Sequence, residues 1–399
     1  MTESGVEQNS AADLVIGLVP ESHDPAVIDG AIGRIIELVP PTGAVLIHPP
    51  YAGNRTEPQH EDSRWRLQAD PQLAHDRSAL AQSLGDSFRA VFQSAQNLNA
   101  RACAIIASDL STVTADWVSL LLQPLVEESF DLVAPCYGRH PFEGMINRAI
   151  IYPLTRALYG KRVRNPLGPD FGLSRNLLAR MAGGGKTRFH PLASLTAEAV
   201  IGGMKVCQSH LGERVYSTPD SSELSSLLAQ VLGPLFLDVE RYAVYWQRSR
   251  ASEEVQEFGH PLTLAGPANA VDVSHLIELF QLGARNLTEV WGMILPPSTL
   301  VELRRLARQD TGVFRLPDET WARIVYDFVL AHRLRTINRD QMLRALTPLY
   351  LGWVASYAME FDNPAPEAVE QRLEGLCVVF ESTKPYLVSR WRWPDRFNP

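Results

Sequence analysis

Polar side chains that could bind a ligand stand shortly after apolar runs of this sequence. Asp109 follows the run Ala102–Ala107, Arg139 follows the run Leu132–Cys136, and Asp170 lies in a glycine- and proline-rich segment. A carboxylate can help to hold a divalent cation, and an arginine fork can bind a carboxylate through two parallel hydrogen bonds. These residue types therefore suggest a site for an anionic or cation-bound ligand.

The residues Arg139, Glu143 and Asn147 are spaced four apart. A helix that begins near Pro141 would place all three on one face, because residues four apart lie one above the other. An arginine beside a carboxylate and an amide can hold a small acid that carries hydroxyl groups. A polar stripe that faces solvent explains the same spacing equally well.

The segment Pro166–Ser174, PLGPDFGLS, contains two glycines and two prolines. They favour an irregular backbone just before a helix that Ser174 would cap, with Asp170 projecting from it. A plain connecting loop does not need so many conformationally special residues. The segment is therefore interpreted as part of a functional site at the sheet edge and not as a structural turn.

The hydrophobic pattern predicts the elements that position these residues. Up to about residue 210, short apolar runs alternate with helical patterns, which predicts parallel strands joined by right-handed crossovers in an open α/β sheet. Ligands of such sheets bind at the carboxyl ends of the strands, and the polar stretch 49–79 is expected to be a loop or lid there. The expected strands are Asp13–Val19, Ala44–Ile47, Ala102–Ala107, Leu132–Cys136 and Lys205–Ser209, and the expected helices are Pro25–Leu38, Leu80–Leu98, Thr114–Glu127 and Phe142–Tyr159.

After about Pro219, helical spacing replaces the strand-like runs. The sequence therefore predicts two domains, an open α/β domain over 12–219 and an all-helical domain over 220–399. The expected helices are Ser221–Arg250, Val273–Trp291, Ser298–Ala307, Asp318–Leu334, Arg339–Glu360 and Pro366–Glu381.

Composition excludes several classes of protein. The formal net charge of −8 argues against a general nucleic-acid binder, and no apolar run is long enough for a membrane span. The polar, acidic beginning lacks the pattern of a secretory signal, and four scattered cysteines without metal-ligand spacing are expected to be reduced core thiols, so a cytoplasmic protein is expected. The sequence contains no GxSxG, HExxH or Cys–His arrangement, so hydrolase and metalloprotease functions have no support.

One stretch of the chain concentrates positive charge. It could face an anionic ligand, or it could be the solvated face of a helix, and charge runs are more often solvated. The residues are Arg148, Arg156, Lys161, Arg162 and Arg164.

Two runs of the sequence resemble a known family. SDLSTVTADW and DLVAPCYGRHPFEGMINRAIIYPLTRALYGKRVRNPLGPDFGLS are similar to the retaining GT-A glycosyltransferases related to mannosylglycerate and glucosylglycerate synthases. The resemblance continues at DETWARIVYDFVLAHR and at Met342–Tyr357, although its specific part is the middle third. It implies a GT-A-like, Rossmann-like open sheet followed by an all-helical C-terminal domain.

The resemblance also implies an activity. Such enzymes transfer a hexose from a nucleotide sugar to the hydroxyl of glycerate, with Mg²⁺ or Mn²⁺ on the diphosphate. By this resemblance Arg139, Glu143 and Asn147 hold the small hydroxy-acid acceptor, and Gly168 and Asp170 form the catalytic loop beneath the transferred sugar.

For the donor, the resemblance points to residues after the first three strands. Asp109 corresponds to the second aspartate of the metal-binding DxD motif, and His210 could be a second metal ligand if the loop register differs. The candidate donor-binding residues are Pro20, Glu21, His48, Ser108 and Asp109.

The chain departs from the family pattern where a metal would bind. Ala107 replaces the first DxD aspartate, His48 stands where an acidic residue is expected, and Val215 or Tyr216 stands at the position of the metal-binding histidine. A lone carboxylate holds Mg²⁺ or Mn²⁺ weakly. Two hypotheses remain: an enzyme that neutralises the leaving diphosphate with basic side chains, and a homologue that kept the fold and lost catalysis.

The sequence thus predicts a glycosyltransferase that acts on a small carboxylated acceptor such as glycerate. The alternative is a catalytically degenerate homologue that serves as a binding or regulatory subunit. A homo-oligomer is compatible with either function.

Overall fold

The computed structural model describes residues 13–20, 24–36, 43–47, 67–68, 84–107, 109–183, 191–214, 221–261, 271–361 and 365–394. The chain forms two compact units. The first consists of Met1–Gly138, Arg164–Arg214 and Val255–Leu262, and the second of Arg139–Val163, Val215–Glu254 and Thr263–Pro399. The segment 139–163, which the sequence analysis places in the α/β domain, thus lies in the second unit, and 255–262 lies in the first.

The first unit is built on one open sheet. Its strand order is β3-β2-β1-β4-β6-β5-β7-β8, and every strand runs in the same direction except β6, which is antiparallel to both β4 and β5. The strands are β1 Leu14–Leu18, β2 Ala44–Ile47, β3 Leu67–Gln68, β4 Ala102–Ile106, β5 Leu132–Gly138, β6 Phe171–Ser174, β7 Val206–Glu213 and β8 Gln256–Phe258.

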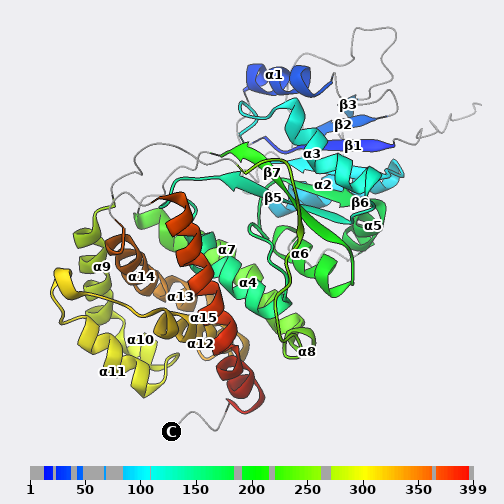
Figure 1. The fold of residues 1–399 in the computed structure, drawn as a ribbon. Coiled ribbons are helices and arrows are strands. Elements are labelled where there is room, and N and C mark those ends of the chain that lie inside the picture. The colour runs from blue at the N-terminus through cyan, green and yellow to red at the C-terminus, as the bar shows by residue number, and fades with distance from the viewer. Residues whose placement is uncertain are drawn as a thin grey trace, which may run out of the picture. The chain divides into compact units, whose positions relative to one another are not determined.

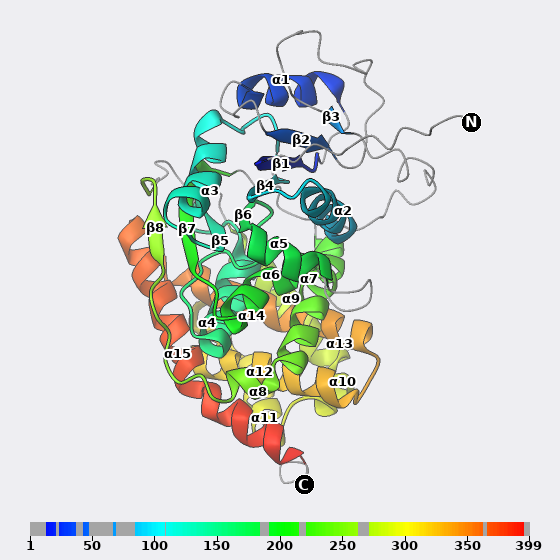
Figure 2. The same ribbon diagram turned by 90° about the vertical axis from the view of Figure 1, so that its right-hand side faces the viewer.

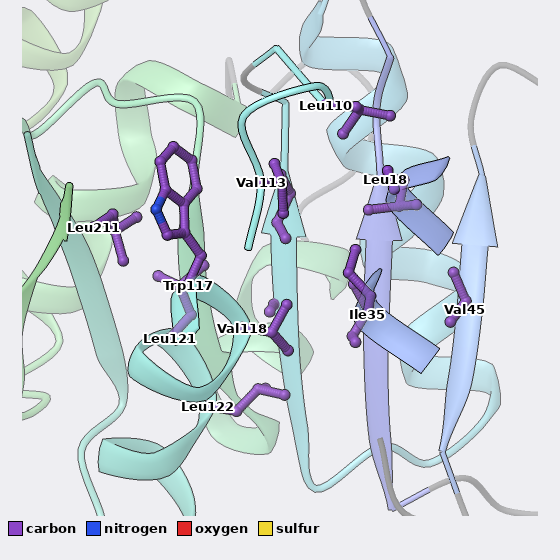
Figure 3. Close-up of a cluster of buried hydrophobic side chains, with 14 of the residues drawn as sticks. Leu18, Ile35, Val45, Leu110, Val113, Trp117, Val118, Leu121, Leu122 and Leu211 are labelled. Carbon is purple, nitrogen blue, oxygen red and sulfur yellow. The ribbon is translucent and has the colours of Figure 1, made fainter. Parts of the chain in front are cut away.

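Helices α1 (Pro25–Ile36) and α3 (Ala115–Glu127) cover one face of this sheet, where they contact each other (Figure 2). The side chains beneath them form a fully buried apolar core, in which Ile35 of α1 and Leu121 of α3 lie over the strands (Figure 3). Removal of this apolar surface from water is the main stabilising term for the sheet.

The opposite side of the unit carries α2 (Leu84–Asn97), α5 (Arg175–Gly183) and α6 (Pro191–Ile201), which contact one another. Helix α2 approaches β1 so closely that a Cβ atom at Gly17 would lie 2.3 Å from Cγ1 of Val91. Glycine at that position therefore permits the close packing of helix on strand.

The second unit is helical. The long helix α15 packs along α12 and α4 (Figure 1). The hydroxyl of Tyr326 in α12 donates to the carbonyl of Phe380 in α15, and the indole N–H of Trp321 in α12 donates to the carbonyl of Ala149 in η1. Its elements are η1 Asn147–Ile151, α4 Tyr152–Tyr159, α7 Ser221–Arg241, α8 Ala243–Trp246, α9 Val273–Asn286, α10 Thr288–Gly292, α11 Pro297–Leu306, η2 Thr311–Val313, α12 Asp318–Leu334, α13 Arg339–Ala345, α14 Thr347–Met359 and α15 Pro366–Arg392.

The predicted fold class, an open α/β sheet followed by a helical C-terminal part, is confirmed. All of the predicted strands are present, and β5 and β7 extend further than expected. The four cysteines are free and buried. None of the helices that the structure describes is long and apolar enough to cross a membrane.

The structure departs from the sequence prediction in several elements. The predicted helices Ser221–Arg250, Val273–Trp291 and Arg339–Glu360 are each divided into two helices, Pro366–Glu381 continues to Arg392, and α6 was not predicted. Strands β3, β6 and β8 were not predicted, because they are short and carry no clear alternation. The predicted helix Phe142–Tyr159 is wrong in its first part: residues 141–144 form a turn, and a π-helical segment, Asn147–Ile151, precedes α4. Gly144 has a φ of 62°, which a regular helix does not accommodate.

Candidate functional site

The order of the strands reverses between β1 and β4. From β1 the chain proceeds to β2 and β3 on one side, whereas β4 lies on the other side of β1. The N–H of Val19 donates to the carbonyl of Ile106 over 2.8 Å, so the two strands stay together to their carboxyl ends. In open α/β sheets, ligands bind outside such a switch point.

Two of the predicted donor-binding residues border this switch point. The buried residue Pro20 follows β1, and the exposed residue Asp109 follows β4. The other predicted donor-binding residues, Glu21, His48 and Ser108, lie outside the residues that the structure describes.

The loop that carries Asp109 is held by its own hydrogen bonds and by α1. One carboxylate oxygen of Asp109 accepts the backbone N–H of Ser111 over 2.9 Å, and the other accepts its hydroxyl over 2.8 Å. Arg34 at the end of α1 donates to the carbonyls of Leu110 and Val113 over 2.7 and 2.9 Å. The position of Asp109 is therefore set before any ligand binds, and both of its oxygens already accept a hydrogen bond.

Asp170 reaches the same edge of the sheet because β6 runs against its neighbours. Phe171 pairs with Ile105, so the residue before β6 lies beside the end of β4. Asp170 is fully buried; one carboxylate oxygen accepts the N–H of Ala107 over 2.9 Å and the other accepts the hydroxyl of Tyr137 over 2.5 Å. The side chain projects from its loop into the protein interior, where it joins the ends of β4 and β5.

The loop before Asp170 packs tightly on β5. A Cβ atom at Gly168 would lie 2.3 Å from Cγ of Pro135, and Asn165 donates its side-chain amide to the Pro135 carbonyl over 2.9 Å. Glycine at 168 is therefore required by close packing. The predicted cap of the next helix is confirmed, since the hydroxyl of Ser174 accepts the N–H of Leu177 over 3.3 Å.

The predicted metal ligand His210 is engaged by another side chain. Its Nε2 lies 2.9 Å from Oε2 of Glu257, which belongs to the neighbouring strand β8. Burial would raise the pKa of Glu257, but the hydrogen bond and charge of His210, together with Arg164, hold that pKa below its usual value. Within the described residues, no group of three or more His, Cys, Asp or Glu side chains could hold a metal ion.

The predicted acceptor residues belong to the second unit. The expectation that Arg139, Glu143 and Asn147 share one helix face is wrong, because the left-handed Gly144 and the turn before it interrupt the helix. Oε2 of Glu143 accepts the N–H of His140 over 3.1 Å and so closes that turn. The guanidinium of Arg139 lies over Gly144, where an added Cβ would come within 2.4 Å of Nη1. Their roles toward an acceptor stay predictions.

The basic stretch is divided between the interior and the surface: Arg156 is buried, whereas Arg164 is exposed. Arg156 is fully buried, because Glu374 and Glu381 of α15 neutralise it over 2.5 and 2.9 Å. Burial of an arginine is tolerable only with such partners. The remaining members also have partners in the chain: Lys161 with Glu253 at 2.6 Å, Arg162 with Glu254 at 3.2 Å, Arg164 with Glu257 at 3.9 Å, and Arg148 with the carbonyl of Pro141 at 2.5 Å.

Two residues at this edge were missed by the sequence analysis. Tyr137, near the end of β5, binds Asp170, and Arg214, directly after β7, holds its guanidinium carbon 5.5 Å from the centre of the Tyr137 ring. The ring of Trp117 at the start of α3 lies 6.1 Å from that of Tyr137. For Tyr137 a signal was available, since it directly follows the predicted strand Leu132–Cys136, where ligands bind. Arg214 lies five residues beyond the predicted strand Lys205–Ser209, so no such signal was available for it.

Comparisons with known proteins give structural matches alone. No protein-family model and no curated protein matches the chain. The chain is similar to crystal structures of glucosyl-3-phosphoglycerate synthase from Mycobacterium tuberculosis. For the complex with Mn²⁺, UDP and glucosyl-3-phosphoglycerate, the identity is 21% and the TM-score 0.41, over 56% of this chain and 79% of that chain.

Two further complexes of that synthase give similar values. With Mn²⁺, UDP-glucose and phosphoglyceric acid, the identity is 19% and the TM-score 0.39, over 58% of this chain and 80% of that chain. With Mg²⁺ and UDP, the identity is 20% and the TM-score 0.41, over 56% and 79%. At this identity and TM-score, the likeness establishes neither a family nor an activity.

Proposed function

We propose that this protein is a GT-A-type glycosyltransferase that binds a nucleotide sugar at the carboxyl edge of its sheet and transfers the hexose to a small carboxylated acceptor such as glycerate. The switch point between β1 and β4 carries the proposal. Pro20 and the preset Asp109 loop border it, and the buried Asp170 stabilises the backbone that follows β4. Nucleotide ligands bind at such positions in open α/β sheets.

For the acceptor, we propose Arg139, Glu143 and Asn147. An arginine that is already folded over a backbone turn loses little conformational entropy when it binds a carboxylate, which favours binding. The acceptor class follows from the guanidinium fork, since it matches the two oxygens of a carboxylate. We further propose that the protein acts in the cytoplasm, as its free, buried thiols favour a reducing compartment.

A second candidate function is a binding or regulatory subunit that retains the donor cleft without catalysis. Ala107 favours it, because a methyl group stands where the resemblance expects a metal ligand. The two functions share donor binding and differ in turnover.

A thermal-shift experiment with the full chain tests donor binding. UDP-glucose and GDP-mannose, each at millimolar concentration, are added with and without Mn²⁺. A ligand that binds the native state alone at roughly 100 times its Kd stabilises it by about 2.7 kcal/mol, so the melting temperature should rise. Absence of any shift with these and other common nucleotide sugars contradicts both candidate functions.

Turnover separates the two candidates. The stabilising donor is incubated with glycerate or with 3-phosphoglycerate, and the glycosylated acid is detected by mass spectrometry. Product that depends on the acceptor supports the transferase. A thermal shift without product, for either acid, supports the binding subunit.

A further inference from the structure

The metal that the resemblance implies does not fit the residues described at this edge. Ala107 supplies no ligand, both oxygens of Asp109 accept hydrogen bonds from Ser111, and His210 is bound to Glu257. Mg²⁺ and Mn²⁺ need several oxygen ligands from protein, water or phosphate. Within the residues that the structure describes, no group of His, Cys, Asp and Glu side chains provides enough ligands for such an ion.

A donor diphosphate nevertheless needs a positive charge, and the basic stretch between Arg148 and Arg164 supplies it poorly. Arg156 is buried between Glu374 and Glu381, and Lys161, Arg162 and Arg164 form ion pairs with glutamates at the surface. A cation that is already paired in this way gains little from a phosphate, because the existing pair must first be broken.

Arg214 stands instead at the carboxyl edge of the sheet. Strand β7 is parallel to β5, and Glu213 pairs with Gly138, so the next residue lies just beyond the strand ends. The Arg214 guanidinium lies against the ring of Tyr137, with 5.5 Å from its central carbon to the ring centre. A guanidinium in a cation–π contact with a ring can still donate N–H groups to a phosphate, so the two interactions are compatible.

The contacts of Tyr137 connect this arginine to the donor-binding loop. Its hydroxyl donates to Asp170, and the same carboxylate accepts the N–H of Ala107, two residues before Asp109. The ends of β4, β5 and β7 are thereby joined through side chains that hold one another in place. A preset cation at such an edge binds an anion without the entropic cost of ordering a flexible side chain.

Resting on the function proposed above, we propose that Arg214 binds the diphosphate of the nucleotide donor and supplies the positive charge there without a metal ion. The ligand class is a nucleoside diphosphate. The phosphate oxygens accept the N–H groups of Arg214, whose guanidinium lies over the Tyr137 ring.

The test is calorimetric titration of the full chain with UDP, in EDTA and in Mn²⁺. We expect the Kd for UDP to differ by less than about threefold between the two conditions, because no hard cation is needed to complete the site. Arg214→Gln should weaken UDP binding by about tenfold or more, and Arg214→Lys less, since it keeps the charge and loses the fork. Uridine, which lacks phosphate, should bind the wild type and Arg214→Gln equally.

The matched control is Lys205→Gln. Lys205 is exposed and stands directly before β7, at the opposite end of the same strand, so this variant removes the same charge far from the carboxyl edge. UDP binding by Lys205→Gln should equal that of the wild type. An equal loss in Lys205→Gln and Arg214→Gln would overturn the inference, because it would reveal a general effect of net charge.

Two other results also decide the matter. If the wild type binds UDP in Mn²⁺ but not in EDTA, and Arg214→Gln binds UDP in Mn²⁺ as tightly as the wild type, the inference is overturned while the proposed function stands. Mn²⁺-dependent sugar transfer that Asp109→Asn abolishes would also overturn the inference and leave the proposed function standing. If no nucleotide binds the wild type under either condition, the proposed function and the inference both fail. Equal melting temperatures of the unliganded variants and wild type would show that any lost binding is not lost folding.

Discussion

The carboxylate of Asp170 accepts the backbone N–H of Ala107 over 2.9 Å, although the two residues are 63 positions apart. Ala107 is the residue at which the chain departs from the DxD pattern. The carboxylate that approaches this point therefore belongs to the residue before β6 and binds the backbone, whereas the resemblance expects a metal-binding carboxylate directly after β4. The same carboxylate binds Tyr137, so a single buried group stabilises the ends of two strands.

Asp170→Ala should destabilise the protein. The N–H of Ala107 and the hydroxyl of Tyr137 would lose their buried acceptor, which costs about 2–4 kcal/mol in the free energy of unfolding. Asp170→Asn should cost less, because its amide oxygen can still accept one of the two bonds. Tyr137→Phe removes the hydroxyl that donates to Asp170, and this loss should cost about 1 kcal/mol in the free energy of unfolding.

Urea unfolding at neutral pH measures all three variants. A midpoint for Asp170→Ala equal to that of the wild type would show that the ends of β4 and β5 do not depend on this carboxylate.

Gly168→Ala should also destabilise the protein, for a steric reason. The new methyl group would lie 2.3 Å from Cγ of Pro135, and neither the proline ring nor the loop can move away freely. Overpacking of this kind costs about 1–3 kcal/mol. The matched control is Gly33→Ala in α1, where nothing lies within 4 Å of the new methyl group; it should stabilise the helix by up to about 1 kcal/mol. Thermal melts should therefore shift in opposite directions, and a lower melting temperature for both would contradict the steric argument.

Arg139→Ala should weaken the binding of glycerate-like acids. Loss of a charged fork costs roughly 2 kcal/mol, or about a thirtyfold rise in Kd. The affinity of Arg139→Lys for the acid should lie between that of the wild type and that of Arg139→Ala, because lysine keeps the charge but lacks the paired donors. Titration calorimetry with glycerate in the presence of the donor measures the effect. Equal affinity of the wild type and Arg139→Ala would leave Arg139 as a structural residue that packs over Gly144.

His332 should make the protein less stable in mild acid. Burial, together with the charges of Arg339 and Arg335, lowers the pKa of His332 to about 4, and its Nδ1 has no hydrogen-bond partner among the described residues. As the pH falls below the ordinary histidine value of about 6.5, the unfolded chain takes up a proton that the folded chain does not, so stability is lost between about pH 6.5 and pH 4.

The expected loss from this histidine between pH 7 and pH 5 is about 2 kcal/mol. Between pH 7 and pH 5, His332→Leu should lose about 2 kcal/mol less of its free energy of unfolding than the wild type loses, whatever its stability at pH 7. Urea unfolding of both proteins at a series of pH values measures the difference, and parallel curves would contradict a buried, neutral histidine.

The sequence by itself determined most of the elements. The alternation of apolar runs and helical patterns located β1, β2 and β4 nearly to the residue, and the helix Asp318–Leu334 is present with the predicted bounds. Such patterns act over one or two turns, so they can be read locally. The sequence also indicated that Asp109 and Asp170 belong to a strand edge with ligand-binding potential.

Tertiary structure alone decided how those residues are used. The direction of β6, which brings Asp170 to Ala107, depends on pairing with two strands distant in sequence. Arg156 is buried because carboxylates of α15, 218 and 225 positions away, neutralise it, and no local charge pattern predicts such a partner. The left-handed backbone of Gly144 interrupts the helix, so Arg139, Glu143 and Asn147 do not share the single face that a regular helix would give them. Periodicity is a property of neighbouring residues, whereas burial, pairing and strand direction depend on contacts that form when distant segments pack together.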